Sequence, residues 1–263
     1  MFIYFDLGNV IAFFDRRKSC QQMAALAGID PAQVEELVFN GPLNNRYERG
    51  DISTPEFYDA FCSATGSKPD LDALMYAKAD IFRLNYSLLP VIAQLEDAGV
   101  RLGILSNTSP CHWEFLSTRG YGILPHAFAV RALSYEVGAL KPEPKMYHAA
   151  AELAGVAPNE IFFCDDTLGH VAAAREAGFD AVQYTSTPKL VAELRDGQFV
   201  GEMSFFTGQL TTADVIASSA LRYLYWRADR LSDLFDHQPA LMGAFHAQLS
   251  SDLARKLAGV NRK

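Results

Sequence analysis

The sequence predicts an α/β protein whose core is a parallel sheet covered by helices on both faces. Short apolar runs recur along the chain, and helical patterns lie between them. A long helical stretch separates the first two runs, and a second one follows the last run. Alternating strands and helices are typical of parallel sheets with helices on both sides. We therefore expect three layers, α/β/α, with one helical insertion and one helical C-terminal extension.

The expected strands are five short runs rich in aromatic and aliphatic residues. They are Phe2–Phe5, Arg101–Leu105, Ala127–Arg131, Ile161–Cys164 and Ala181–Tyr184. Core helices are expected at Leu89–Ala98, Lys145–Ala154, Leu168–Ala177 and Pro188–Arg195. A glycine follows each of the first three helices, as is common at helix ends. We assign residues 1–14 and 86–198 to this core.

The stretch between the first two strands is too long for one crossover helix, so it predicts a separate cap over residues 15–85. Its helices are expected at Lys18–Ala27, Pro31–Phe39, Pro55–Ser63 and Leu71–Phe82. Because this insertion follows the first strand directly, it would lie above the carboxyl ends of the strands. Residues 199–263 form the extension, where apolar residues recur at helical spacing. We expect the extension to pack on its own domain, with homo-oligomerisation through its helices as the alternative.

Composition and charge narrow the classes of function. The chain has 263 residues and a net charge of −8, which argues against nucleic acid as a partner. No uninterrupted apolar run approaches the ~18 residues of a membrane-spanning helix, so we expect no membrane partner. The first residues lack the basic segment of a secretory signal. We therefore expect a cytoplasmic protein with reduced cysteines.

Polar residues fall at the carboxyl ends of the expected strands or in the loops beside them. They form four clusters: Asp6, Ser106-Asn107-Thr108, Lys141 and Asp165-Asp166. Parallel topology brings strand ends to one edge of the sheet, where ligands bind. Each cluster alone could cap a helix or lie on the surface, but four such coincidences are improbable, so we expect a functional site there.

The charges of these residues indicate what the site holds. Three carboxylates that converge cannot all stay ionised unaided, and Lys141 offsets only one of them. A hard divalent cation would offset the rest, and oxygen ligands together with substrate phosphate suit Mg²⁺. Ser106 and the backbone N–H groups near Asn107 would bind phosphate oxygens. The constellation is typical of phosphoryl transfer.

Four motifs carry a resemblance to a known family. FDLGNV, LSNTS, the run from Gly138 to Pro144 and FFCDD occur in this order. They resemble the four motifs of the haloacid dehalogenase superfamily of hydrolases, over residues 1 to about 195, with a cap between the first and second motifs. Within it, DLGNV with LSNT is similar to small bacterial phosphatases, including those that act on α-glucose 1-phosphate. The resemblance implies a Rossmann-like core and does not include the extension.

The resemblance also implies a role for each matching residue. Asp6 corresponds to the nucleophile that becomes an aspartyl phosphate, and Lys141 to the lysine that steadies nucleophile and phosphate. Ser106, Asn107 and Thr108 correspond to the phosphate-binding motif. The implied metal ligands are Asp6, the carbonyl of Gly8, Asp166, and Asp165 directly or through water.

Gly8 departs from the family pattern, because most phosphatases of this family have an aspartate there that protonates the leaving group and activates water. Loss of this aspartate should lower the rate of hydrolysis about 10²–10⁴-fold unless another group replaces it. Glu48 of the cap and His170, where the family often has asparagine, are candidates. A sugar 1-phosphate would lessen the need, since its leaving oxygen is less basic than an alkoxide.

Three functions follow from this pattern. We expect a Mg²⁺-dependent phosphatase that acts on a small phosphorylated metabolite, which could be a sugar phosphate. The first alternative is a metal-independent 2-haloacid dehalogenase, since those relatives also lack the second aspartate, but they have no use for paired carboxylates such as Asp165 and Asp166. The second alternative is a binding or scaffold protein that keeps the phosphate pocket but turns over weakly.

Overall fold

The computed structural model describes residues 2–118, 127–194 and Met242 of the chain. Two compact units divide the chain, Met1–Leu190 and Val191–Lys263. Of the second unit, only the end of one helix and Met242 are among the described residues, so the helices expected within residues 199–263 lie outside them. The fold and the site belong to the first unit.

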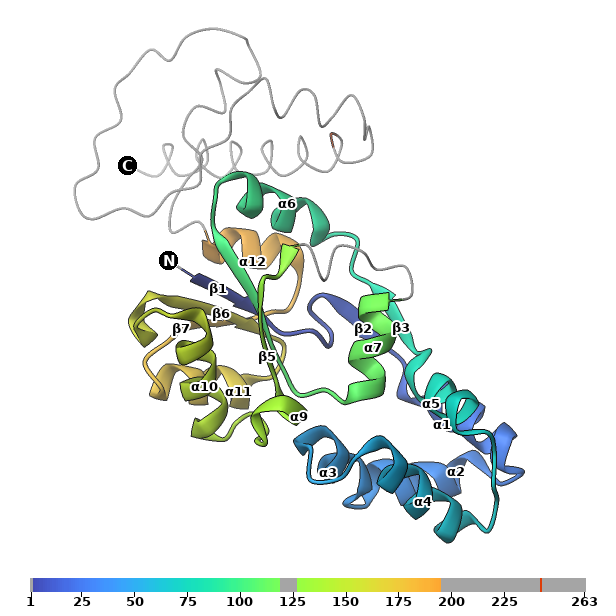
Figure 1. Cartoon of the computed structure of the whole chain (residues 1–263). Coiled ribbons are helices and arrows are strands. Elements are labelled where there is room, and N and C mark those ends of the chain that lie inside the picture. The colour runs from blue at the N-terminus through green and yellow to red at the C-terminus, as the bar shows by residue number, and fades with distance from the viewer. Residues whose placement is uncertain (1, 119–126, 195–241, 243–263) are drawn as a thin grey trace, which may run out of the picture. The chain divides into compact units, whose positions relative to one another are not determined.

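A five-stranded parallel sheet forms the centre of the first unit, in the order β5-β4-β1-β6-β7 (Figure 1). The strands are β1 (Phe2–Phe5), β4 (Arg101–Ser106), β5 (Val130–Leu133), β6 (Ile161–Asp165) and β7 (Asp180–Gln183). The expected parallel α/β fold is confirmed. Strand β5 begins later than the expected Ala127, because the apolar residues before it pack instead of pairing: the Phe128 ring lies edge-on to Phe5, at 6.2 Å between centroids.

Helices cover both faces of the sheet. α10 (Pro144–Ala154) and α11 (Leu168–Glu176) lie on one face, and α6 (Leu89–Asp97) and α12 (Thr187–Leu194) on the other (Figure 1). β1 is central in the sheet and all four of its residues are buried, as expected for a strand with helices on both sides. Phe2 and Tyr4 belong to the buried core that also includes Met146 and Tyr147 of α10.

The cap lies between β1 and β4 and consists mainly of helices. These are α1 (Arg16–Ala27), α2 (Pro31–Val34), a π-helix (Glu35–Asn40), α3 (Leu43–Arg49), α4 (Thr54–Thr65) and α5 (Leu71–Ala79). They are flanked by a two-stranded antiparallel ribbon, β2 (Ala12–Phe14) with β3 (Phe82–Leu84). Phe82 was expected to end a helix, but α5 ends at Ala79 and Phe82 pairs with Phe14 across the ribbon.

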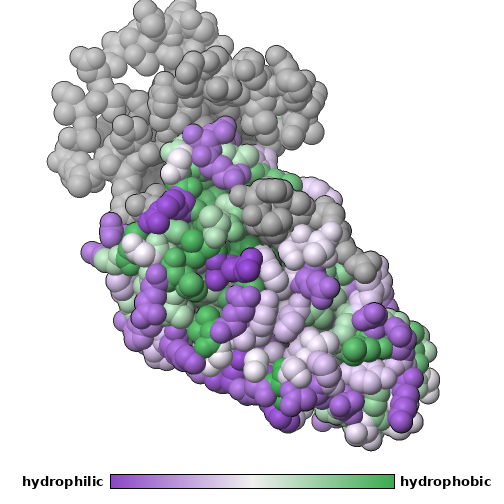
Figure 2. Space-filling view, viewed as in Figure 1, coloured by the Kyte–Doolittle hydropathy of each residue, from purple (hydrophilic) through white to green (hydrophobic). Residues whose placement is uncertain are grey.

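Hydrophilic residues are spread over the face of the molecule drawn in Figure 2, between smaller hydrophobic areas. In the part of the chain that the structure describes, no helix is both long and apolar enough to cross a membrane.

The cap packs on the core partly through a buried lysine. Lys78 of α5 is fully buried, and its Nζ lies 3.3 Å from Nε2 of His112 in α7 (Pro110–Thr118). The ring centroids of Phe39, Tyr47 and Phe57 each lie 5.7 Å from the same nitrogen, so aromatic faces stabilise the ammonium. Burial, together with the charge of Lys78, lowers the pKa of His112 well below its ordinary value. His112 is therefore neutral at pH 7 and accepts the hydrogen bond.

Candidate active site

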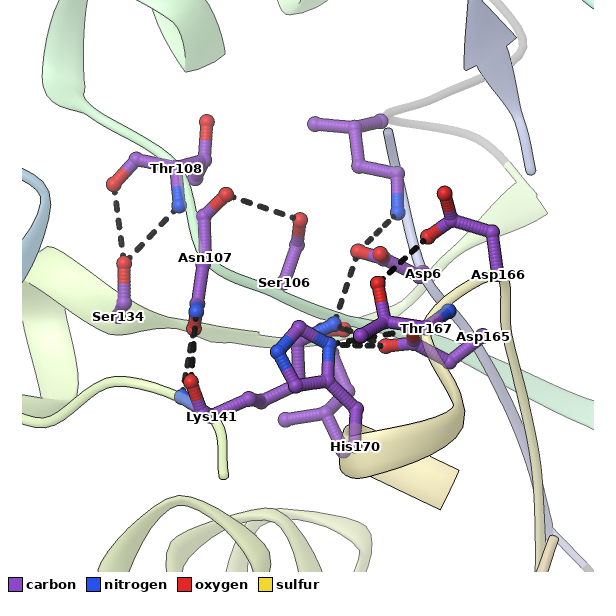
Figure 3. Close-up of polar contacts among 12 residues, drawn as sticks. Asp6, Ser106, Asn107, Thr108, Ser134, Lys141, Asp165, Asp166, Thr167 and His170 are labelled. Atoms are coloured by element: carbon purple, nitrogen blue, oxygen red, sulfur yellow. Dashed lines mark hydrogen bonds and ion pairs between the residues drawn. The ribbon is translucent and has the colours of Figure 1, made fainter. Parts of the chain in front are cut away.

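The carboxyl ends of three neighbouring strands bring the expected site residues together. Asp6 directly follows β1, Ser106 ends β4 and Asp165 ends β6, and β1 pairs with both of the other strands. The Asp6 amide donates to the Cys164 carbonyl at 2.9 Å, which extends the pairing of β1 to the site itself. The three side chains are almost fully buried and converge in Figure 3.

Lys141 completes this cluster from the loop that precedes α10. Its Nζ lies 3.0 Å from Asp6 Oδ1 and 2.5 Å from Asp165 Oδ2, and it donates to the Leu105 carbonyl at 3.0 Å. Asn107 fixes the lysine backbone from both sides. Its Oδ1 accepts from Lys141 N at 2.7 Å, and its Nδ2 donates to Lys141 O at 2.9 Å. The Asn107 side chain thus positions Lys141. Only the main-chain N–H of Asn107 remains available for phosphate.

Burial and charge pull the pKa values of this cluster in opposite directions. Burial raises the pKa of Asp6, Lys141 lowers it, and Asp165 raises it again, so that it lies at about 6. Burial alone would also raise the pKa of Asp165, but Lys141 and the hydrogen bond from His170 outweigh it and hold the pKa at about 2. For Lys141, the two carboxylates outweigh burial and raise its pKa. Lys141 thus neutralises Asp165 more completely than Asp6.

The donors around Asp165 occupy both of its oxygens. Oδ2 binds Lys141, and Oδ1 accepts from the Thr167 amide at 2.8 Å. His170, a candidate acid–base residue, also contacts this carboxylate: its Nδ1 lies 3.1 Å from each oxygen (Figure 3). Ligand-type atoms of Asp6, Asp165 and His170 lie within 4.8 Å of one another, although the Lys141 ammonium already binds two of these residues.

Asp166 is held in place by a residue that the sequence reasoning missed. Asn9 Nδ2 donates to Asp166 Oδ2 at 2.9 Å, across the gap between the loops that follow β1 and β6. Asn9 adopts φ of 56°, a left-handed conformation that asparagine tolerates better than most residues. The sequence could suggest a turn at Asn9, because asparagine is common in turns, but it could not indicate the contact with Asp166.

The chemistry of the expected ligands fits a magnesium ion. The buried Lys141 ammonium contacts two carboxylates, Asp6 and Asp165, and burial of Asp6 leaves its pKa raised despite that positive charge. Asp166, the Gly8 carbonyl and Asp6 offer oxygen atoms only, and oxygen ligands are what Mg²⁺ prefers.

Position 8, where the family usually has an acid–base aspartate, faces an aromatic ring. A Cβ at Gly8 would lie 3.1 Å from Cε1 of Phe14 in β2. The Phe14 side chain is partly exposed, at 39%, so it can move aside.

Thr108, the third residue expected in the phosphate-binding motif, is buried and is linked to the cap through Ser134. The Thr108 amide donates to Ser134 Oγ at 2.9 Å, and the Ser134 hydroxyl donates to the Glu48 carbonyl at 2.5 Å. Ser134 begins α9 (Ser134–Val137) and was not anticipated. Glu48, one of the two candidate acid–base residues, thus contacts Ser134 through its main-chain carbonyl.

Comparisons with known proteins identify the family. Residues 9–178 match the family model of haloacid dehalogenase-like hydrolases. A D-ribitol-5-phosphate phosphatase from Bacteroides thetaiotaomicron is 26% identical over 197 residues, which cover 69% of this chain and 90% of the relative. A glyceraldehyde 3-phosphate phosphatase from Methanopyrus kandleri is 33% identical over 177 residues, which cover 64% of this chain and 74% of the relative.

A solved structure supports the fold. It is a haloacid dehalogenase family enzyme from Bacteroides thetaiotaomicron, in complex with magnesium and inorganic phosphate, and it superposes with a TM-score of 0.63 at 24% identity. The match covers 70% of this chain and 94% of that one. The match of residues 9–178 to the family model confirms the family and the hydrolase class expected from the motifs: the chain belongs to the haloacid dehalogenase-like hydrolases.

Proposed function

We propose that this chain is a Mg²⁺-dependent phosphatase that hydrolyses a small sugar or polyol phosphate through an aspartyl phosphate on Asp6. One observation carries the proposal: a buried carboxylate at the end of the central strand lies 3.0 Å from the buried ammonium of Lys141. An ionised carboxylate beside a fixed positive charge can attack phosphorus without a general base, and the ammonium balances the charge of the phosphoryl group. The phosphatase relatives described above support the same reaction class.

The reaction proceeds in two displacements at phosphorus. An Asp6 oxygen forms a bond to phosphorus while the bond to the ester oxygen breaks, and the alcohol leaves with a proton. Water then attacks the phosphorus of the acyl phosphate, which releases inorganic phosphate and returns Asp6 as a carboxylate. Ser106 and the Asn107 amide hold phosphoryl oxygens, while the two hydrogen bonds from the Asn107 side chain keep Lys141 in place.

The residues proposed to hold Mg²⁺ are Asp6, Asp166 and the carbonyl of Gly8, with Asp165 directly or through water. When bound, the ion neutralises negative charge on the nucleophile and the phosphate. Asn9 fixes the Asp166 carboxylate by its hydrogen bond of 2.9 Å.

The leaving group has no aspartate at position 8 to protonate it. We therefore propose a substrate whose ester oxygen leaves readily or is protonated by water, and a sugar 1-phosphate meets the first condition. The named substrates of the two relatives, D-ribitol 5-phosphate and glyceraldehyde 3-phosphate, have more basic leaving oxygens and should be tested as well.

The test is phosphate release across a panel of sugar and polyol phosphates, with Mg²⁺ and with EDTA. We expect release that depends on Mg²⁺ and is lost in Asp6→Asn, and a much lower rate on simple alkyl phosphates than on p-nitrophenyl phosphate. Chloride release from 2-chloropropionate in EDTA would instead establish the dehalogenase alternative. Binding of a phosphate analogue without turnover on any ester would favour the scaffold alternative.

A further inference from the structure

Besides the contact of Lys78 with His112, the cap contacts the core through three consecutive residues at the end of α3. They are Glu48, Arg49 and Gly50, and we call them the docking loop. The Glu48 carbonyl accepts the hydrogen bond from Ser134 at 2.5 Å. Arg49 donates twice to the carboxylate of Glu143, from Nη1 to Oε2 at 2.8 Å and from Nη2 to Oε1. Any Cβ at Gly50 would collide with the Tyr135 carbonyl, so only glycine lets the backbones approach this closely.

Two of these core contacts belong to segments that carry site residues. The hydroxyl that binds Glu48 also accepts from the Thr108 amide, next to the phosphate-binding motif. Glu143 lies just after Lys141, and it fastens the turn around that lysine: its amide donates to the Leu140 carbonyl at 2.7 Å, and its Oε1 accepts from the Leu140 amide at 3.3 Å. The carboxylate that Arg49 binds from the cap is therefore the one that braces the Lys141 turn.

The Arg49–Glu143 pair is suited to break and form again. The two side chains are 34% and 39% exposed, and ion pairs open to water are weak. Two parallel hydrogen bonds nevertheless fix one orientation of the guanidinium on the carboxylate. The hydrogen bonds from Arg49 lower the pKa of Glu143, which keeps the carboxylate charged at neutral pH. A weak contact with a defined geometry lets the cap leave and return to the same position.

We propose that Arg49 is a positioning residue for the reaction, which acts through Glu143 on Lys141, so that docking of the cap completes the catalytic cluster. This inference rests on the proposed function. When Arg49 is hydrogen-bonded to Glu143, the Leu140–Glu143 turn is fixed and Lys141 Nζ stays between Asp6 and Asp165. When the cap separates, the turn loses this brace and the ammonium is less tightly placed beside the nucleophile.

Kinetics of matched variants test the proposal. Arg49→Gln and Glu143→Gln should each lower kcat on p-nitrophenyl phosphate about tenfold, with KM changed much less, and the double variant should lose no more than either single one. Arg49→Lys keeps the charge but not the two-bond geometry, so it should lose nearly as much as Arg49→Gln.

Two controls separate this effect from a general loss of charge. Arg46→Gln removes an exposed arginine from the same helix. Asp51→Asn removes the second acid beside Arg49, whose Oδ2 lies 3.8 Å from Nε. Both controls should keep the wild-type rate. Additive losses in the double variant, or an equal loss in Arg46→Gln, would overturn the proposal.

Amide hydrogen exchange tests the same coupling without turnover. The Lys141 N–H is protected by its hydrogen bond to Asn107 Oδ1 at 2.7 Å. Its exchange, measured by NMR, should be faster in Arg49→Gln than in wild type or Arg46→Gln, and unchanged exchange would contradict the proposal. If the wild-type protein released no phosphate from any ester, the proposed function would fail, and the exchange comparison alone would decide whether Arg49 acts on Lys141.

Discussion

Asp6 and its neighbours illustrate what single residues can reveal. The convergence of Asp6, Ser106, Lys141 and Asp165 could be predicted because parallel strands end at one edge of a sheet, whatever lies between them in sequence. The hydrogen bonds that hold them could not. The hydrogen bonds from the Asn107 side chain to Lys141 were not anticipated, and neither were the contacts of Ser134 with Thr108 and of Asn9 with Asp166. Such supporting contacts depend on tertiary packing, which no local spacing encodes.

Gly8 gives the sharpest prediction at this scale. Restoring the acid–base group with Gly8→Asp should accelerate hydrolysis of simple alkyl phosphates by about 10²-fold, the lower end of the usual contribution of such a group. p-Nitrophenyl phosphate should gain much less, because its leaving group needs no proton. Phe14 must shift slightly to admit the new side chain, and its exposure allows this.

Gly8→Asn is the matched control, since asparagine has the same size and cannot transfer the proton. Steady-state rates on both esters decide the question. Equal rates for the two variants on the alkyl phosphate would mean that position 8 does not act on the leaving group.

At the scale of helices and strands, the buried strands and the helices that end at a glycine were predicted well, and the short, partly exposed elements of the cap poorly. β1, β4, β6 and β7 and the helices α6, α10 and α11 lie where the apolar runs and the terminal glycines place them. α3 and the β2–β3 ribbon were missed, because they are short and only partly buried, so their apolar residues show no clear period. The missed α3 supplies the docking loop, so the contacts between cap and core were invisible in the sequence.

The contact between α5 and α7 predicts how stability depends on pH. Because the folded state lowers the pKa of His112, the unfolded chain binds a proton that the folded chain does not, once the pH falls below about 6.5. This contribution to stability is complete above that pH and is lost as the pH falls toward the lowered pKa. The slope for one such group is about 1.4 kcal/mol per pH unit.

His112→Asn removes the titration and keeps an oxygen that can accept from Lys78. The free energy of unfolding, measured by urea titration from pH 7.5 to 5, should therefore fall less steeply in the variant than in wild type. Groups such as Asp6 and Asp165 titrate in both proteins and cancel in the comparison. Parallel curves would show that His112 is not held neutral by its burial beside Lys78.

For the whole molecule, family and fold class could be predicted from four motifs in the right order, and both are confirmed by the match over residues 9–178 and by the parallel sheet. The substrate could not be predicted, since the roles implied by the four motifs concern the phosphoryl group and the metal, and none concerns the rest of the substrate. The proposed extension, residues 199–263, lies outside the described residues apart from Met242, so its expected helices and its part in homo-oligomerisation stay predictions.

The most direct test of the mechanism is detection of the phosphoryl group on the nucleophile. The enzyme is mixed with its best ester from the panel in Mg²⁺, quenched in acid during the first turnover, digested, and analysed by mass spectrometry. We predict that the peptide containing Asp6 gains the mass of one phosphoryl group and that Asp6→Asn shows neither this adduct nor phosphate release. Phosphate release by Asp6→Asn at the wild-type rate, or an adduct on a different residue, would contradict the assignment of Asp6 as the nucleophile.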